Sequence, residues 1–181
     1  FAEAIPYYEA ALRLKPRDYE ARSNLGNTLA KTGRMDEALA QHRLAWQSRP
    51  EDARLCRNLA AALTGRGELD EAIGLYQQAL GRQPSDPSLR YELGLALALQ
   101  ERWEEASEQY TLALRFNANS AEVHYNLGYA LRRQGRLEEA GMQFRAALRL
   151  QPEFPLAHYN LGCVLADQGR REEAVAHLTE A

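Results

Sequence analysis

Adjacent carboxylates recur along this chain and are the first residues that could do chemistry. The five pairs are Asp36-Glu37, Asp70-Glu71, Glu104-Glu105, Glu138-Glu139 and Glu172-Glu173. Two neighbouring carboxylates can divide the roles of general acid and general base when their surroundings separate their pKa values. The same residue types also stabilise the first turn of a helix, where the dipole is positive. Because a pair recurs every 34 residues, we interpret the pairs as structural.

The sequence offers few other candidates for catalysis. It contains no phosphate-binding loop, dinucleotide fingerprint, serine elbow or zinc-protease helix motif. His124 and His158 lie 34 residues apart, but no third ligand accompanies them, and a zinc site needs three or four. We interpret both histidines as packing residues. The sequence therefore predicts no enzyme activity, no cofactor and no metal.

Four asparagines keep the same interval, and each stands directly before a leucine. They are Asn24, Asn58, Asn126 and Asn160, with Glu92 in the place between the second and the third. A carboxamide both donates and accepts hydrogen bonds, so a row of asparagines can hold the backbone of an extended peptide in either direction. The alternative is that these side chains only bond neighbouring backbone between helices. The sequence leaves both interpretations open.

Tyrosines form a second row. They are Tyr91, Tyr125 and Tyr159, with Tyr129 beside them. Tyrosine supplies rigid amphipathic contact area and is favoured at recognition surfaces, and packing between repeats is the alternative. Arg54 and Arg57 make the opposite end of the chain more basic and suited to a carboxylate.

One interval of 34 residues positions all of these side chains. Leucines keep it five times, at Leu25, Leu59, Leu93, Leu127 and Leu161. A fixed period of this size indicates stacked copies of one supersecondary unit. Each copy holds two runs of apolar residues at helical spacing, usually separated by a glycine and closed by a proline. Each copy is therefore predicted to form helix, turn and helix, and the fold class is all-α.

The period divides the chain into six segments of a single array. We expect 1–18 to be the second helix of a preceding repeat, 155–181 to be an incomplete final repeat, and the complete repeats to be 19–52, 53–86, 87–120 and 121–154. The third complete repeat departs from the pattern. Glu101 replaces its turn glycine and Ala118 replaces its proline, so we expect a strained or altered turn there.

One copy of the repeat shows which family the pattern resembles. The residues His124, Leu127-Gly128, Leu131, Gly135, Ala140, Phe144, Ala147 and Pro152 resemble the tetratricopeptide repeat family, and the resemblance covers the whole chain. It implies antiparallel helix pairs stacked into a right-handed superhelix, with first helices lining the concave face. Since ligand-facing side chains of the family come from first helices, it implies a peptide site of Asn24, Asn27, Arg54, Arg57, Asn58, Tyr91, Glu92, Tyr125, Asn126, Tyr129, Tyr159 and Asn160. The asparagine row is similar to that of the repeat domain of O-linked N-acetylglucosamine transferases.

Composition excludes several classes of partner. The formal net charge is -3 and the pI is near 5.9, whereas nucleic-acid binders usually show a basic excess. No apolar run approaches the ~20 residues of a membrane span, so we expect no membrane insertion. Cys56 and Cys163 lie three repeats apart, too far for a disulfide between neighbours. Free cysteines favour the cytoplasm, but the chain begins at Phe1 and its localisation stays open.

These features together predict a scaffold that binds a protein or an extended peptide in a concave groove. Asparagines would grip the peptide backbone and tyrosines would make apolar contacts. One alternative is a substrate-recruiting arm of a larger enzyme, such as a glycosyltransferase. Another is a self-assembling scaffold, in which uncapped terminal helices associate end to end.

Overall fold

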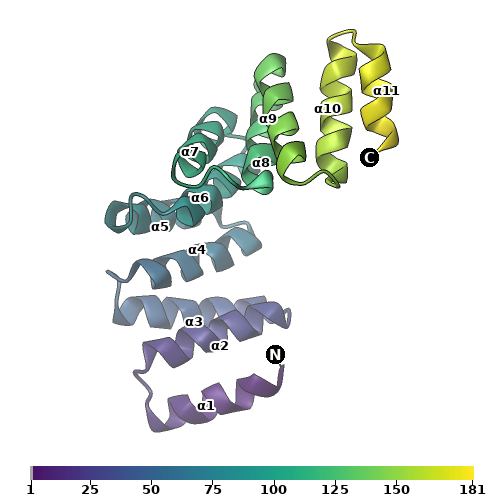
Figure 1. Cartoon of the computed structure of the whole chain (residues 1–181). Helices are drawn as coiled ribbons and strands as arrows, with labels where there is room; N and C mark the ends of the chain where they lie inside the picture. Colours follow the sequence, from purple (N-terminus) through teal and green to yellow (C-terminus); the bar gives the residue numbers. More distant parts are fainter. Residues whose placement is uncertain (1) are drawn as a thin grey trace. The chain divides into compact units, whose positions relative to one another are not determined.

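A computed structural model describes residues 2–181, and helices dominate it (Figure 1). Phe1, the first residue of the expected segment 1–18, lies outside the described residues. No strand occurs in the described range. After the short 3-10 helix η1 (Ala2–Ala4), the helices are α1 (Ile5–Leu14), α2 (Tyr19–Lys31), α3 (Met35–Ser48), α4 (Ala53–Arg66), α5 (Leu69–Arg82), α6 (Pro87–Leu99), α7 (Trp103–Phe116), α8 (Ala121–Arg133), α9 (Leu137–Leu150), α10 (Pro155–Asp167) and α11 (Arg171–Thr179).

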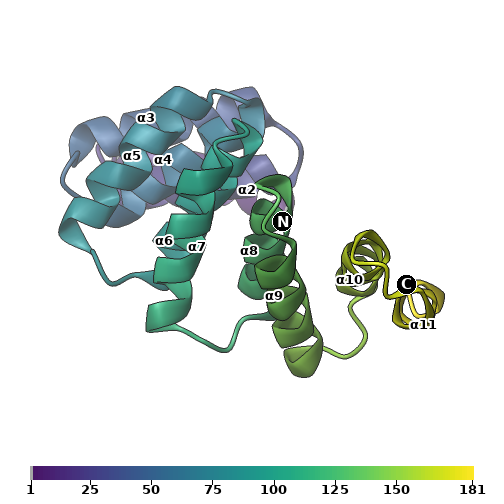
Figure 2. The same ribbon diagram turned by 90° about the horizontal axis from the view of Figure 1, so that it is seen from above.

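The chain divides into two compact units, Phe1–Ser85 and Asp86–Ala181. In the first unit, α2 pairs with α3 and α4 pairs with α5. In the second unit, the pairs are α6 with α7, α8 with α9, and α10 with α11. The members of the last pair lie side by side in both ribbon views (Figures 1 and 2). Each expected repeat from residue 19 onward begins at the first residue of a helix, which we call the first helix of its pair.

Short polar side chains start most of the first helices. Asp18 accepts a hydrogen bond from the backbone N–H of Ala21 at 2.9 Å, and Asp86 accepts from the N–H groups of Ser88 and Leu89. Such caps satisfy backbone donors that have no partner inside the helix. They explain why the first helices begin at a constant distance from the preceding second helix.

The turn inside each pair needs a left-handed residue. Gly33, Gly67, Gly135 and Gly169 take it with φ between 76° and 80°. Glu101 occupies the same place with φ 59° and is the one positive-φ residue other than glycine in the described range. The backbone therefore keeps the family geometry at this turn, and Glu101 bears the strain of an L side chain in that conformation.

A small residue of the first helix meets a large side chain of the second helix within each pair. A Cβ atom added at Gly94 would lie 2.5 Å from the Tyr110 ring, and one added at Gly128 would lie 2.8 Å from the Phe144 ring. Real Cβ contacts are not this short, so only glycine permits this approach of the helices. Tyr110 and Phe144 are almost completely buried as a result.

The histidines of the first helices make hydrogen bonds in addition to packing. His124 bonds through Nδ1 to the Gln143 Oε1 atom at 2.7 Å and through Nε2 to the Ala118 carbonyl at 3.3 Å. His158 makes equivalent bonds to His177 Nδ1 and the Pro152 carbonyl, at 3.0 and 2.9 Å. The slot thus ties each first helix to its own partner and to the preceding linker.

The carboxylate pairs lie at the starts of the second helices. The second member of the pair forms an ion pair with the arginine three residues earlier, as in Arg136–Glu139 at 2.7 Å and Arg170–Glu173 at 2.6 Å. The arginine hydrogen bond holds the pKa of Glu139 below its ordinary value. These carboxylates therefore serve the helix start, as the sequence pattern indicates.

His42 is the exception among the large side chains that fill the glycine slot, and it generates a prediction about pH. Burial lowers its pKa from 6.5 to about 4, and its Nδ1 atom has no hydrogen-bond partner among the described residues. Between pH 6.5 and 4 the unfolded chain therefore takes up a proton that the folded chain does not. The free energy of unfolding should fall as pH falls through this window, by up to about 3 kcal/mol.

The His42→Phe variant should lose this pH dependence and gain about 1 kcal/mol at pH 7, because no buried nitrogen remains unpaired. Phe144 shows that phenylalanine fits the slot. Chemical denaturation followed by circular dichroism at pH 7.5, 5.5 and 4.5 measures both effects. Parallel pH curves for the variant and the native chain would refute the assignment.

The strained turn at Glu101 gives a second prediction. Glu101→Gly should raise the free energy of unfolding by about 1 kcal/mol, because glycine adopts the left-handed conformation without steric cost. Glu101→Ala is the matched control, since it removes the carboxylate, 3.8 Å from Arg133, but keeps the Cβ atom. Thermal and urea denaturation should show a gain for glycine only, and an equal gain for alanine would assign the effect to charge.

Candidate functional site

In the first unit, the predicted asparagines and one arginine line a common crevice. Ser23, Asn24, Arg54 and Asn58 lie around a space of about 240 Å³ between α2 and α4. Asn58 donates from Nδ2 to the Ser23 hydroxyl at 2.9 Å, so its amide joins the two repeats. Its bonding partner is thus a side chain of the preceding repeat, whereas the sequence suggested backbone.

The basic character of this end is largely offset. Arg54 approaches the Asp52 carboxylate at 3.1 Å and the Glu20 carboxylate at 3.9 Å. Asn24 and Asn27 are exposed on α2, and Arg57 is half-buried on α4. Of these predicted residues, Asn24 and Arg54 therefore share the crevice, while Asn27 and Arg57 do not line it.

In the second unit, each asparagine of the row holds a tyrosine of the preceding repeat. Asn126 donates from Nδ2 to the Tyr91 hydroxyl at 3.1 Å and to the Glu122 carbonyl at 3.0 Å. Asn160 donates to the Tyr125 hydroxyl at 3.4 Å and to the Leu156 carbonyl at 2.8 Å. These bonds join a tyrosine to the residue 35 positions later. The two predicted rows are thus one connected structure.

The tyrosine rings rest on the large side chains of the core. The Tyr91 ring lies 6.0 Å from the Tyr110 ring, and the Tyr125 ring lies 5.9 Å from Phe144 and 5.0 Å from Phe154. Burial is the main cause that raises the pKa of Tyr91 and Tyr125 above the ordinary value. Both hydroxyls therefore keep their protons at neutral pH, and each can accept from asparagine while donating outward.

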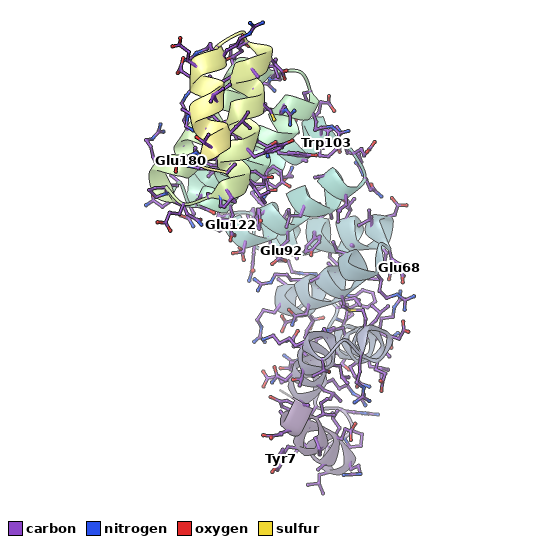
Figure 3. The ribbon with its side chains drawn as sticks, turned by 90° about the vertical axis from the view of Figure 1, so that its right-hand side faces the viewer. Tyr7, Glu68, Glu92, Trp103, Glu122 and Glu180 are labelled. Atoms are coloured by element: carbon purple, nitrogen blue, oxygen red, sulfur yellow. The ribbon has the colours of Figure 1, made fainter. Side chains whose placement is uncertain are left out.

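Tyr129 belongs to a separate aromatic cluster. Its ring contacts the edge of Trp103 at 5.8 Å, and the Arg133 guanidinium lies over the other ring at 4.4 Å from the Trp103 centroid. The arginine also approaches Glu101 at 3.8 Å. Trp103 was not among the residues predicted from the sequence, and its position two residues after the irregular turn was the available signal. It is labelled in Figure 3.

The remaining predicted residues differ in their surroundings. Tyr159 has 52% of its surface exposed, whereas Glu92 is half-buried. Glu122, which is labelled with Glu92 in Figure 3, lines a crevice of about 190 Å³ together with Tyr91. Asn160 is almost fully buried, and its Oδ1 atom accepts from Arg132 at 3.1 Å. Arg132 and Phe154 are supporting residues that the sequence pattern did not single out.

Repeated helix pairs joined through one recurrent surface define a helical-repeat protein. Sequence models described as TPR repeat match residues 61–101, 96–135 and 128–169, and models described as tetratricopeptide repeat match 1–53 and 159–181. The chain belongs to the tetratricopeptide repeat family. A comparison with curated protein sequences gives no match.

Several solved structures share the fold. YrrB, described as a TPR protein with an unusual peptide-binding site, is 25% identical, with a TM-score of 0.79 over 96% of this chain and 89% of its own. MamA from Desulfovibrio magneticus RS-1 is 20% identical, with a TM-score of 0.84 over 90% and 92%. PilF of Pseudomonas aeruginosa is 23% identical, with a TM-score of 0.80 over 92% and 77%. The last two likenesses concern the fold alone. Among the helices of residues 2–181, none is long and apolar enough to cross a membrane.

The asparagine–tyrosine bonds should contribute measurable coupling between repeats. Asn126→Ala and Tyr91→Phe each remove one side of a bond, so a double-mutant cycle should give an interaction of about 1 kcal/mol in the free energy of unfolding. Asn24→Ala is the matched control, because Asn24 holds the same repeat position but is exposed, and it should change stability by less than about 0.5 kcal/mol. Urea denaturation measures all four forms, and additive single effects at the first pair would disprove the coupling.

Proposed function

We propose that the second unit binds an extended segment of a partner protein on its first-helix surface, which we define by Tyr91, Tyr125, Asn126, Tyr129 and Tyr159. The observation that carries this proposal is the fixed, protonated state of Tyr91 and Tyr125. Their rings are braced by the core and their hydroxyls are held by asparagines. A rigid tyrosine loses little conformational entropy on binding, so it can contribute much of its contact area to affinity.

The asparagines take two roles in this proposal. The amide N–H groups of Asn58, Asn126 and Asn160 hold the preceding repeat. The Oδ1 atoms of Asn58 and Asn126 are left to accept a backbone N–H of the peptide, and Asn24 supplies both kinds of group from its exposed position. The grip on the peptide backbone is thus assigned to the amide oxygens of these residues.

Membership of the family supports a non-catalytic interaction scaffold. YrrB, which shares the fold at 25% identity, is described as having a peptide-binding site. The tyrosines and asparagines lie on first helices, where the family resemblance places ligand contacts. Protein or peptide is therefore the class of partner that we propose.

Selection from displayed random peptides of about 12 residues, which span at most about 40 Å when extended, tests the proposal. The chain should enrich peptides that bind saturably by fluorescence anisotropy. Tyr159→Ala should weaken the selected peptides about tenfold, because it removes exposed aromatic contact area without touching the core.

Two variants serve as controls for this selection. Tyr7→Ala alters an equally exposed tyrosine of α1 in the other unit and should leave affinity unchanged. Tyr125→Phe keeps the ring and should weaken binding by about two- to tenfold through the lost hydroxyl. Selection of no binder, or equal losses for Tyr159→Ala and Tyr7→Ala, would refute binding at this surface.

A further inference from the structure

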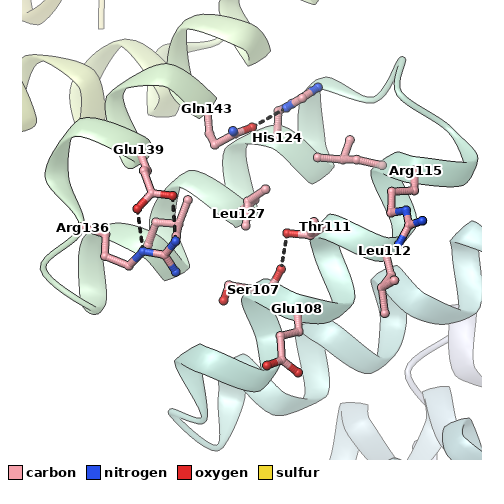
Figure 4. Close-up of a pocket in the computed structure, with 12 residues that line it drawn as sticks. Ser107, Glu108, Thr111, Leu112, Arg115, His124, Leu127, Arg136, Glu139 and Gln143 are labelled. Atoms are coloured by element: carbon pink, nitrogen blue, oxygen red, sulfur yellow. Dashed lines mark hydrogen bonds and ion pairs between the residues drawn. The ribbon is translucent and has the colours of Figure 1, made fainter.

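The second unit also carries a groove that the first-helix surface does not use. It lies between α7 and α9, has a volume of about 760 Å³, and has α8 as its floor (Figure 4). The floor residues His124, Leu127 and Leu131 follow the spacing of one helix face. Tyr125 and Tyr129 belong to the other face of the same helix. The second-helix groove, as we name this space, is therefore separate from the proposed peptide surface.

Small side chains of α7 open the second-helix groove. Ser107 stands where α3, α5 and α11 carry Leu39, Ile73 and Val175. Thr111 stands where α3 and α9 carry Arg43 and Arg145. Each replacement removes volume from the wall of the groove. The space is thus specific to the third repeat.

Most polar side chains of the groove are already satisfied inside the protein. Ser107 donates to the Glu104 carbonyl at 2.7 Å, and Thr111 donates to the Ser107 carbonyl at 2.8 Å. Figure 4 shows the His124–Gln143 bond and the Arg136–Glu139 ion pair on the opposite side. The walls are helices, whose backbone groups bond internally. An extended peptide would therefore find few partners for its own backbone N–H and C=O groups.

Two charges of the second-helix groove remain unpaired. Glu108 and Arg115 line it from α7, and neither has a hydrogen bond or ion pair with any residue of the described range. They are seven residues apart, which is about 10 Å along the helix axis. Leu112, half-buried between them, adds apolar surface with Leu114. The groove thus presents an acidic end, an apolar middle and a basic end.

We propose that the second-helix groove binds an amphipathic helix of a partner protein. A helix satisfies its own backbone and needs only an apolar face and matched end charges. The partner helix would carry a basic residue opposite Glu108 and an acidic residue opposite Arg115, seven positions apart, with apolar residues between them. The scaffold would then bind one extended and one helical segment on different surfaces.

A displayed library of helical peptides of about 18 residues, or five turns, tests this proposal. Apolar positions are randomised and two charged positions seven residues apart are fixed as Lys/Glu in either order, as Lys/Lys or as Glu/Glu. The native chain should enrich Lys/Glu helices over the like-charged sets by about two- to fivefold, as expected for exposed ion pairs. Arg115→Glu should shift the preference to Lys/Lys helices.

Thr111→Arg is the blocking variant. It introduces the residue that α3 and α9 carry at the same position, so the fold accommodates it, while the longer side chain fills the groove. Binding of the selected helices should fall at least about tenfold. Tyr159→Ala should not affect the helices, and Thr111→Arg should not affect peptides selected on the first-helix surface, so the failure of either proposal is recognised separately.

Other outcomes would overturn the proposal. Enrichment of no helix, or of helices insensitive to Thr111→Arg, would show that the groove is not their site. Enrichment of extended peptides that Thr111→Arg blocks would assign the groove to a different ligand class. Concentration-dependent self-association that Thr111→Arg abolishes, measured by sedimentation, would assign it to a second copy of the chain.

Discussion

The structure depends on the close approach of a glycine in each first helix to a large side chain in the second helix. This approach brings the two helices of a pair together and buries Tyr110 and Phe144 between them. Where the large residue is His42, the same approach buries an imidazole and costs the proton. Shape therefore decides the chemistry of the slot, because desolvation follows from the geometry of the helix pair.

The candidate site is a consequence of this packing. Tyr91 and Tyr125 lie against the buried rings of their own repeats, so core packing fixes the angle of the rings. The asparagine of the following repeat then fixes the hydroxyl. A contact inside one repeat and a bond between repeats thus orient the same side chain. This arrangement suits a stack, in which stability is a sum of terms within repeats and between neighbours.

Much of the fold could be predicted from the period, since capping residues, glycines and apolar spacing are local signals. The irregular turn at Glu101 was predicted for the same reason, and its positive φ confirms the strain. The bond from Asn126 to Tyr91 could not be predicted, because it joins positions 35 residues apart, and the rotation between stacked helices selects that partner. The second-helix groove was missed because its volume depends on how the side chains of α9 face the small residues of α7.

The third repeat shows how a repeat protein acquires specificity. Packing restricts the positions that set the helix pair, as the buried Gly94 and Ala106 indicate. The positions beside them tolerate change, and Ser107 and Thr111 use this freedom to open space on the outer wall of α7. Glu101 shows that even the turn accepts an unfavourable residue, because packing on both sides holds the helices in place. Departures from the repeat pattern therefore concentrate where they alter surface and leave the helix pair intact, and such positions are where a partner can be distinguished.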